Sequence, residues 1–361
     1  MRCTNNEINN GRRARRSEHS YQKERSRRRK KRWLIFRFSF LSVLLVAILS
    51  GLVYEFLLKS HEITLVMAYD KGSTVYGYEK VLQGNGFAKS YTADLCVAPL
   101  EDIGVESLML EAAAAGVFSE SDQKTVYAKA VHEKKYPASL TKVMTCLVAL
   151  KYGNLDDVVT VGEECKDIEY GSSVCEIQPG DILTLRELLL GLMINSGNDA
   201  AMTVAMHVGG SVENFIAMMN REAERIGAVN THFMNAHGLQ NEEHYTTVYD
   251  MYLIFHEALK QEGFKDMIGR HIYYASFTNV NGEERNVTWE STNYYFINQA
   301  VPPKDVEVIG GKTGTTSDAG ACLILLNKNK YGNEYVTVLM KEPDKDSLYK
   351  EMNQLLGKIN E

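Results

Sequence analysis

Hydrophobic and polar residues are distributed differently along three zones of the chain. Residues 38–54 contain no charged side chain, and apolar neighbours extend this stretch to residues 33–58. A stretch of that length approaches the roughly 20 residues that a membrane-spanning helix needs. Residues 59–85 mix polar residues with glycine and predict a linker, whereas residues 86–361 have the hydrophobic patterning of a folded domain.

The middle of the predicted domain has the pattern of helices. Residues 143–150 are almost wholly apolar and predict a buried helix that stops at Gly153. Residues 154–183 are expected to form turns. Thr184 and Glu187 then make a capping-box pattern, which predicts the start of the next helix. Further helices are expected to begin at Asp199, Ser211 and Thr247.

Strand-like segments lie at both ends of the predicted domain. Residues 112–119 and 124–130 predict a hairpin around a polar turn. Residues 346–358 predict a closing helix. Central helices with strands at both ends predict an α+β fold built on one antiparallel sheet. The remaining strands of that sheet are expected at residues 306–309, 321–326 and 335–340.

Charge separates the two ends of the chain. Residues 1–32 carry thirteen Lys or Arg and three Glu, a net charge of +10, which leaves −16 for the rest of the −6 total. We expect a disordered basic tail in the cytoplasm, because positive charge marks the cytoplasmic flank of a membrane span. A cleaved signal peptide is the alternative. The long apolar core, with no A-x-A spacing of small residues after it, favours a retained anchor, and we expect no nucleic-acid partner.

One short pattern suggests a nucleophile. Ser139 and Lys142 are three residues apart at the start of the predicted buried helix, so their side chains share one face. Serine is a weak nucleophile unless a base takes its proton. Lysine can be that base if burial or a neighbouring cation lowers its pKa. The pattern is short, so it becomes informative only when partner motifs accompany it.

Two partner motifs follow at defined distances. Ser196-Gly197-Asn198 interrupts two apolar helices, and a polar break in buried surface is costly unless its groups are used. Residues 312–314, Lys-Thr-Gly, lie in a strand-like segment and offer a cation, a hydroxyl and room for a ligand. The three motifs are separated by 57 and 116 residues, counted from Ser139 to Ser196 and from there to Lys312.

Together, S-x-x-K, S-x-N and K-T-G resemble the motif set of the penicillin-recognising serine enzymes. More narrowly, residues 105–361 look like the low-molecular-weight D-alanyl-D-alanine carboxypeptidases of peptidase family S11. The resemblance implies a penicillin-binding/β-lactamase-like fold, with an antiparallel sheet flanked by helices and an all-α cluster. The matching text is YPASLTKVMT at 136–145, NSGNDAA at 195–201, NAHGL at 235–239 and GGKTGTT at 310–316.

The resemblance also implies the chemistry of the first two motifs. Ser139 would attack the carbonyl between two terminal D-alanines and become an acyl-ester, with Lys142 as the base. Ser196 would relay a proton to the leaving D-alanine. Asn198 would hold the peptide amide and orient Lys142. The implied substrate is the stem pentapeptide of peptidoglycan, the implied covalent inhibitors are β-lactam antibiotics, and neither a metal nor a cofactor is implied.

The third motif is implied to bind the substrate. Lys312 and Thr313 would hold the terminal carboxylate, Gly314 would leave room for the ligand, and the backbone N–H groups of Ser139 and Thr315 would form the oxyanion hole. Many relatives carry an arginine after this strand. The present chain has none after Arg285, so a threonine or another lysine would have to take its place.

The resulting expectation is a membrane-anchored D,D-carboxypeptidase of a bacterial cell membrane, with its catalytic domain outside the cytoplasm. Two alternatives remain open. A β-lactamase would need a deacylation base, and no convincing glutamate for that role is apparent. A non-catalytic penicillin-sensing or wall-binding module would acylate and stay acylated. The family often adds a C-terminal β-rich domain and anchor, whereas this chain is expected to anchor through its N-terminus.

Cysteine and histidine add little to this picture. The six cysteines show no metal-like spacing, and a bond between Cys165 and Cys175 stays an open possibility. The pair His256-Glu257 lacks the second histidine of an H-E-x-x-H zinc motif. His237 and His244 lie close to the family text without an acidic or cysteine ligand set, so a structural role is expected for both.

Overall fold

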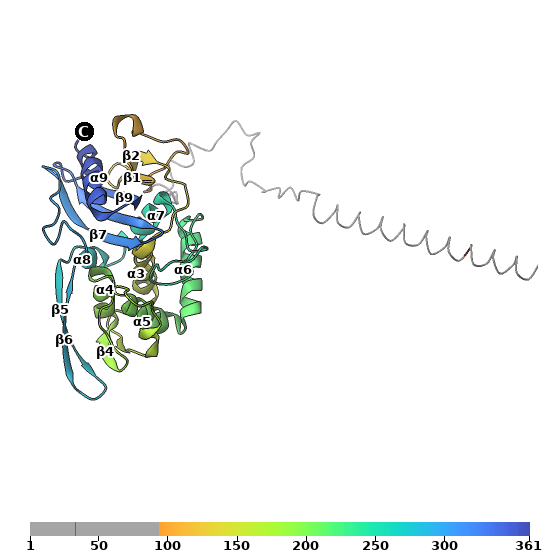
Figure 1. Cartoon of the computed structure of the whole chain (residues 1–361), viewed down its shortest axis with the longest axis vertical. Helices are drawn as coiled ribbons and strands as arrows, with labels where there is room; N and C mark the ends of the chain where they lie inside the picture. The colour runs from red at the N-terminus through yellow and green to blue at the C-terminus, as the bar shows by residue number, and fades with distance from the viewer. Residues whose placement is uncertain (1–32, 34–93) are drawn as a thin grey trace, which may run out of the picture. The chain divides into compact units, whose positions relative to one another are not determined.

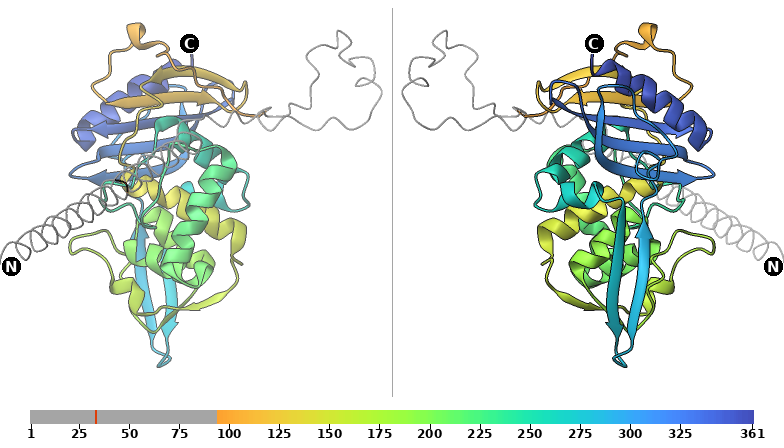
Figure 2. Two further views of the ribbon diagram at one scale, coloured as in Figure 1. Left: turned by 90° about the vertical axis from the view of Figure 1, so that its right-hand side faces the viewer. Right: turned by 90° about the vertical axis from the view of Figure 1, so that its left-hand side faces the viewer.

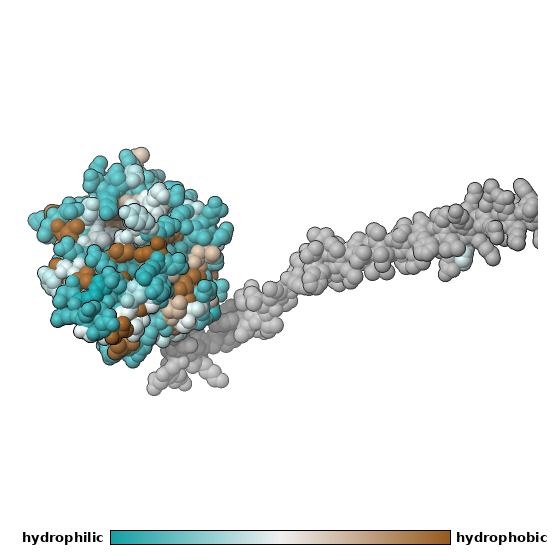
Figure 3. Space-filling view, turned by 60° about the horizontal axis from the view of Figure 1, so that its bottom comes forward, coloured by the Kyte–Doolittle hydropathy of each residue, from teal (hydrophilic) through white to brown (hydrophobic). Residues whose placement is uncertain are grey.

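The computed structural model describes Trp33 and residues 94–361. The expected basic tail and linker, and the expected membrane helix apart from Trp33, lie outside the described residues and stay predictions. Across the part of the chain that is described, no helix combines the length and the hydrophobicity needed to cross a bilayer. The face shown in Figure 3 is largely hydrophilic, with hydrophobic side chains scattered over it in small groups.

A five-stranded antiparallel sheet joins the two ends of the domain (Figure 1). Its order is β2-β1-β9-β8-β7, so the N-terminal hairpin pairs with C-terminal strands, with Val117 of β1 opposite Thr337 of β9. This confirms the expectation that both ends of the sequence build one sheet. The strands are β1 Ala114–Ser119, β2 Lys124–Lys129, β7 Glu307–Thr316, β8 Gly320–Lys328 and β9 Glu334–Glu342.

Helices cover both faces of this sheet, because its central strands are apolar on both sides. In β8, Ile324 packs into the helical core while its neighbours Leu323 and Leu325 pack on the opposite face. That opposite face is covered by α9, Lys345–Lys358, which confirms the expected closing helix. Figure 2 shows α9 on one side of the sheet and the helical cluster on the other.

The helical cluster follows the local signals in the sequence. It consists of α3 Thr141–Tyr152, α4 Leu185–Ile194, α5 Asn198–Gly209, α6 Val212–Ile226 and α7 Val248–Leu259. Thr184 and Glu187 form both hydrogen bonds of the predicted capping box. Ser211 and Thr247 likewise cap α6 and α7 by accepting a backbone N–H. α3 is buried over almost its whole length, as its apolar sequence predicts, and places its first turn rigidly at the edge of the sheet.

The expectation of a single sheet is wrong. A second sheet, of order β3-β4-β5-β6, crosses the opposite end of the helical cluster (Figure 2). Two of its strands have only three and four residues, too few to show a period of two, and the long hairpin is mostly polar because much of it faces solvent. A five-residue helix, α8 Phe264–Ile268, was also missed. The strands are β3 Val158–Thr160, β4 Asp181–Thr184, β5 Ile272–Asn279 and β6 Glu284–Glu290.

Candidate active site

Ser139 and Lys142 are placed by one turn of helix. Ser139 lies in η3, Ala138–Leu140, a single 3-10 turn that leads directly into α3. The Ser139 side chain is partly exposed, whereas Lys142 is completely buried. The Lys142 Nζ lies 2.9 Å from the Ser139 Oγ. The start of the buried helix therefore places a partly exposed hydroxyl, that of Ser139, next to the fully buried amine of Lys142.

The Lys142 amine has three hydrogen-bond partners, whereas a neutral amine has only two N–H groups to donate. It lies 2.7 Å from the Asn198 Oδ1 and 2.8 Å from the His237 carbonyl oxygen, in addition to Ser139. Burial, and then the charge of Lys312, hold the pKa of Lys142 well below its usual value. A neutral amine has two N–H groups, which Asn198 and His237 accept. Its lone pair then points at the Ser139 hydroxyl, the geometry of a general base.

The second motif meets the third across the site. Ser196 lies between α4 and α5 with a left-handed φ of 61°, an uncommon conformation for a residue other than glycine. Its Oγ accepts a hydrogen bond of 2.9 Å from the Lys312 Nζ, which also donates to the Thr313 carbonyl at 2.8 Å. Lys312 is buried, and burial lowers its pKa to about 7. A second buried lysine, whose charge changes near neutral pH, therefore contacts Ser196, the predicted proton relay.

Gly314 allows β7 to pass against the nucleophile. A Cβ atom built at Gly314 would lie 2.9 Å from the Ser139 backbone nitrogen and 3.1 Å from that of Leu140, closer than side-chain atoms normally approach. Any other residue would push the strand and η3 apart. The close approach brings the residue after Gly314, Thr315, next to Ser139, as an oxyanion hole made of their two N–H groups requires.

Thr292 belongs to the site although no motif contains it. It follows β6, and its Oγ1 lies 2.5 Å from the Thr313 Oγ1, so one of the two hydroxyls donates to the other. The pair fixes the direction of the Thr313 hydroxyl, which is expected to hold the substrate carboxylate. The sequence offers no signal for Thr292, because the contact spans 21 residues and depends on the turn between β6 and β7.

Asp199 is a second residue that the motifs did not reveal. It is almost completely buried beside Asn198, and its carboxylate accepts hydrogen bonds from the backbone nitrogens of Cys175, at 2.8 Å, and Ile177, at 3.2 Å. Burial raises the pKa of Asp199, and these N–H groups oppose the rise. The Asn198 nitrogen also donates to the Ser173 carbonyl at 2.8 Å. Asp199 therefore ties the neighbouring loop to the start of α5.

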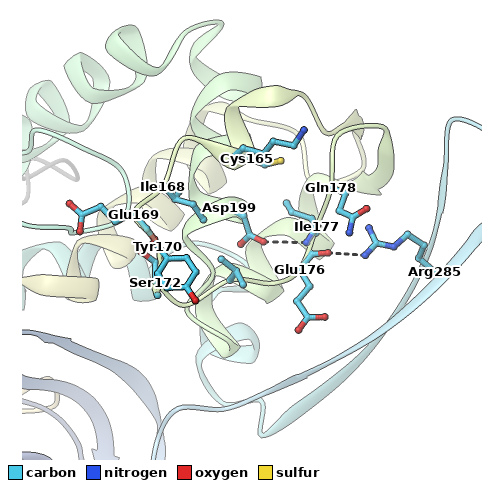
Figure 4. A pocket seen from close by; sticks show the side chains of 13 residues that line it. Cys165, Ile168, Glu169, Tyr170, Ser172, Glu176, Ile177, Gln178, Asp199 and Arg285 are labelled. Carbon is cyan, nitrogen blue, oxygen red and sulfur yellow. Dashed lines mark hydrogen bonds between the residues drawn. The ribbon is translucent and has the colours of Figure 1, made fainter.

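That loop lines an open cavity of about 650 Å³ beside the second motif (Figure 4). Asp199 lies at its centre, and Arg285 reaches it from β6, where it donates to the Glu176 carbonyl and pairs with Asp181. Arg285 is therefore engaged in joining the loop to the second sheet. Cys165 lines this cavity, and both Cys165 and Cys175 are free, buried thiols in the structure.

His237 and His244 lie buried next to the first motif, and their structural role stays a prediction. The His237 carbonyl accepts from Lys142, and burial lowers the pKa of both rings to about 3, so both are neutral. The His244 Nδ1 accepts from the Met234 nitrogen at 3.1 Å. Its proton is therefore on Nε2, which lies 2.8 Å from the Thr141 Oγ1. Within the described residues, no group of three His, Cys, Asp or Glu side chains is arranged to hold a metal ion.

Comparison with known proteins agrees with this geometry. The family model described as D-alanyl-D-alanine carboxypeptidase, peptidase S11, matches residues 103–344. D-alanyl-D-alanine carboxypeptidase DacF of Bacillus subtilis is 34% identical over 221 residues, which are 59% of this chain and 53% of that protein. The D-alanyl-D-alanine carboxypeptidase of Streptomyces sp. strain K15 is 33% identical over 211 residues, 55% of this chain and 70% of that protein.

A solved structure has the same fold. The crystal structure of the Streptomyces K15 DD-transpeptidase has a TM-score of 0.64 and 28% identity, and the match covers 69% of this chain and 97% of that one. The chain spans about half the length of the first curated relatives that it matches, 53% and 49%. The family match itself covers most of the present chain and includes all three motifs. The chain belongs to the D-alanyl-D-alanine carboxypeptidase family, peptidase family S11.

Proposed function

We propose that this protein is a serine D,D-carboxypeptidase that removes the terminal D-alanine from stem pentapeptides of peptidoglycan. The observation that carries the proposal is the buried Lys142 amine, 2.9 Å from the Ser139 hydroxyl and hydrogen-bonded to Asn198 and His237. This arrangement supplies an activated nucleophile at neutral pH. The family membership supplies the class of bond that it attacks.

In the acylation step, the Ser139 Oγ attacks the carbonyl between the two D-alanines while Lys142 takes the hydroxyl proton. The N–H groups of Ser139 and Thr315 stabilise the negative charge on the carbonyl oxygen. The C–N bond then breaks, and the leaving amine receives a proton through Ser196, which is hydrogen-bonded to Lys312. The products of this step are free D-alanine and an ester on Ser139.

In the second step, water attacks the ester carbonyl and Ser139 is regenerated. Lys142 is the only amine within hydrogen-bond distance of the Ser139 Oγ in the described part of the chain, so we assign it to activate that water too. The released acyl product is the stem tetrapeptide. If an amine acceptor took the place of water, the product would instead be a transpeptidation product.

The terminal carboxylate is proposed to bind at Lys312 and Thr313. Lys312 supplies positive charge, and Thr292 directs the Thr313 hydroxyl. No arginine follows Arg285 in the sequence, and Arg285 itself is paired with Asp181. Lys312 and Thr313 would therefore bind the terminal carboxylate without the additional arginine that takes part in many relatives.

We further propose that residues 33–58 anchor the protein in the bacterial cell membrane, with residues 1–32 in the cytoplasm and the catalytic domain outside. The uncharged stretch and the +10 charge that precedes it support this topology. Protease added to spheroplasts should remove the domain and leave a small protected fragment. A mature protein that begins after residue 50 would show instead that the segment is a cleaved signal.

Mass spectrometry of the full-length chain tests the activity. Benzylpenicillin should add its mass to the peptide that contains Ser139, and a D-Ala-D-Ala pentapeptide should lose one alanine and leave unmodified enzyme. The Ser139→Ala variant should do neither. Rapid turnover of nitrocefin would indicate a β-lactamase, and a stable adduct without release of D-alanine would indicate a sensing module. An adduct on any other residue would contradict the assignment of the nucleophile.

A further inference from the structure

A cationic cavity of about 290 Å³ lies apart from the three motifs. Its lining contains three lysines and one glutamate, a net charge of +2, together with two aromatic rings. Nothing in the mechanism above uses these groups. The residues that line it are Lys134, Lys135, Tyr136, Glu242, Tyr245 and Lys341.

The cavity is close to the nucleophile on one side and to the end of β7 on the other. Tyr136 precedes Ser139 by three residues, so their Cα atoms are at most about 11 Å apart. On the other side, a Cβ built at Gly320 would lie 3.4 Å from the Lys341 Cα. Gly320 pairs with Thr316, the last residue of β7, so Lys341 stands at the end of the sheet just beyond the third motif.

Lys341 lies in a β-bulge at the end of β9. The register between β8 and β9 shifts after Ala321, and Lys341 adopts a left-handed φ of 65° within this bulge. β-Bulges occur next to active sites, where they redirect a side chain. Here the bulge leaves Lys341 exposed while the next residue, Glu342, is buried. The residue with this uncommon backbone conformation is therefore also the one that contributes a lysine from β9 to the lining of the cavity.

The three lysines differ in their partners. Lys135 is paired with Glu133 at 2.6 Å, and the Lys134 Nζ lies 3.8 Å from the centre of the Tyr245 ring. For Lys341, no carboxylate of residues 94–361 lies within ion-pairing distance. Lys341 and Lys134 are therefore the cations that remain available to an anion.

The expected direction of the substrate leads to this cavity. If the terminal carboxylate lies at Lys312 and Thr313, and the scissile carbonyl at the Thr315 N–H, the peptide lies antiparallel to β7. The N-terminal part of the peptide then points toward Thr316, the C-terminal end of the strand. Its acyl part then continues past Thr316 toward the turn before Gly320. That is the end of the sheet where the Lys341 side chain stands.

We propose that Lys341, with Lys134, binds a carboxylate on the acyl part of the substrate peptide, upstream of the scissile bond. The Tyr136 and Tyr245 rings form the walls of this subsite, against which the apolar part of an acidic side chain can pack. This inference rests on the proposed function, because it uses the direction in which a D,D-carboxypeptidase holds its substrate. It assigns a preference for acidic stem peptides to a residue outside the three motifs.

Matched peptides test this subsite. Two peptides that end in D-Ala-D-Ala and differ only by Glu or Gln upstream of the scissile bond are given to the full-length chain. We expect kcat/KM to be about two- to fivefold higher for the Glu peptide, as is typical of a solvent-accessible ion pair, and the ratio to fall as salt is added. Lys341→Asn should bring the ratio to about one, because Asn removes the charge and tolerates a positive φ.

Lys330→Asn is the matched control, since Lys330 lies in the turn between β8 and β9 at the opposite end of the sheet. It should keep the ratio of the wild-type chain. Equal rates for the two peptides with the wild-type chain, or an unchanged ratio in Lys341→Asn, would overturn the subsite and leave the proposed function intact. Failure to release D-alanine from either peptide would overturn the proposed function, and the subsite with it.

Discussion

Two pairs of like ionisable side chains are buried in the described part of the protein, one on each face of the large sheet, and their burial has different consequences. Lys142 in α3 and Lys312 in β7 lie on the face that the helical cluster covers. There, both N–H groups of the neutral Lys142 have an acceptor, and the Ser139 hydroxyl is partly exposed. Glu342 in β9 and Glu351 in α9 lie on the other face. Both side-chain oxygens of Glu342 are buried without a hydrogen-bond partner.

Burial shifts the pKa in both regions. It lowers the pKa of Lys142 and Lys312, and burial together with the nearby Glu351 raises the pKa of Glu342. Of these two pairs, only the lysines contact serine hydroxyls, and one of these, that of Ser139, is partly exposed. A perturbed pKa is therefore a sign of function only where an accessible reacting group accompanies it. The carboxyl pair instead makes the stability of the fold depend on pH.

The largest expected effect is on the rate of Ser139 acylation, which should depend on the lysine pair and not on the carboxyl pair. Lys142→Met keeps the side-chain volume and removes the base, so the rate of Ser139 acylation by a β-lactam should fall about 10²- to 10⁴-fold. Glu342→Gln should acylate at close to the rate of the wild-type chain. The rates are measured by stopped-flow or quenched mass spectrometry. A Glu342→Gln chain that folds but acylates as slowly as Lys142→Met would contradict the division.

The next effect concerns the other buried cation. Lys312→Ala should reduce kcat/KM about 10- to 150-fold on a peptide with a free terminal carboxylate, because a charge-assisted hydrogen bond contributes about 1.5–3 kcal/mol. Loss of Lys312 should also raise the pKa of Lys142, which affects a peptide with an amidated terminus equally. The difference between the two peptides isolates the carboxylate contact. Equal losses would mean that Lys312 acts only through Lys142.

The carboxyl pair should appear in stability against pH. The folded-state pKa of Glu342 is raised above its usual value of 4.5, so the folded state holds this proton more tightly than the unfolded state does. The stabilisation is present below pH 4.5 and is lost as the pH rises through the folded-state pKa. Glu342→Gln, which stays neutral, should therefore gain about 1–2 kcal/mol over the wild-type chain between pH 5 and pH 9.

Urea unfolding at several pH values measures this gain. The advantage of Glu342→Gln should grow with pH, and D-alanine release should show no corresponding change. Parallel stability curves for the two chains would show that Glu342 is ionised throughout, with Lys129 or solvent compensating its charge.

The smallest effect tests a neutral hydrogen bond of the active site. Thr292→Val should lower kcat/KM about two- to tenfold on the free-acid peptide, because a neutral hydrogen bond contributes about 0.5–1.5 kcal/mol. Thr292→Ser, which keeps the hydroxyl, should restore most of the activity. The loss should be smaller on the amidated peptide. A serine variant as impaired as the valine variant would show that Thr292 acts through packing instead.

Local signals in the sequence were sufficient for the elements that carry the motifs. The capping box at Thr184, the caps at Ser211 and Thr247 and the stop at Gly153 all depend on neighbours within a few residues. The Ser139–Lys142 contact is likewise set by three residues of helix. For the same reason the two short strands of the second sheet and α8 went unrecognised, since their pairing partners are distant and their own pattern is too short.

The tertiary structure alone decided what surrounds the motifs. Thr292 reaches Thr313, Asp199 holds the loop at Cys175, and Lys341 is turned into its cavity by a bulge. Residue types could suggest that Lys142 is a base. Its lowered pKa, however, results from complete burial and from a second cation 170 residues away in the sequence, and no local pattern encodes either condition. Chemistry that depends on one turn of helix is visible in the sequence, whereas electrostatics depends on how distant segments exclude water from each other.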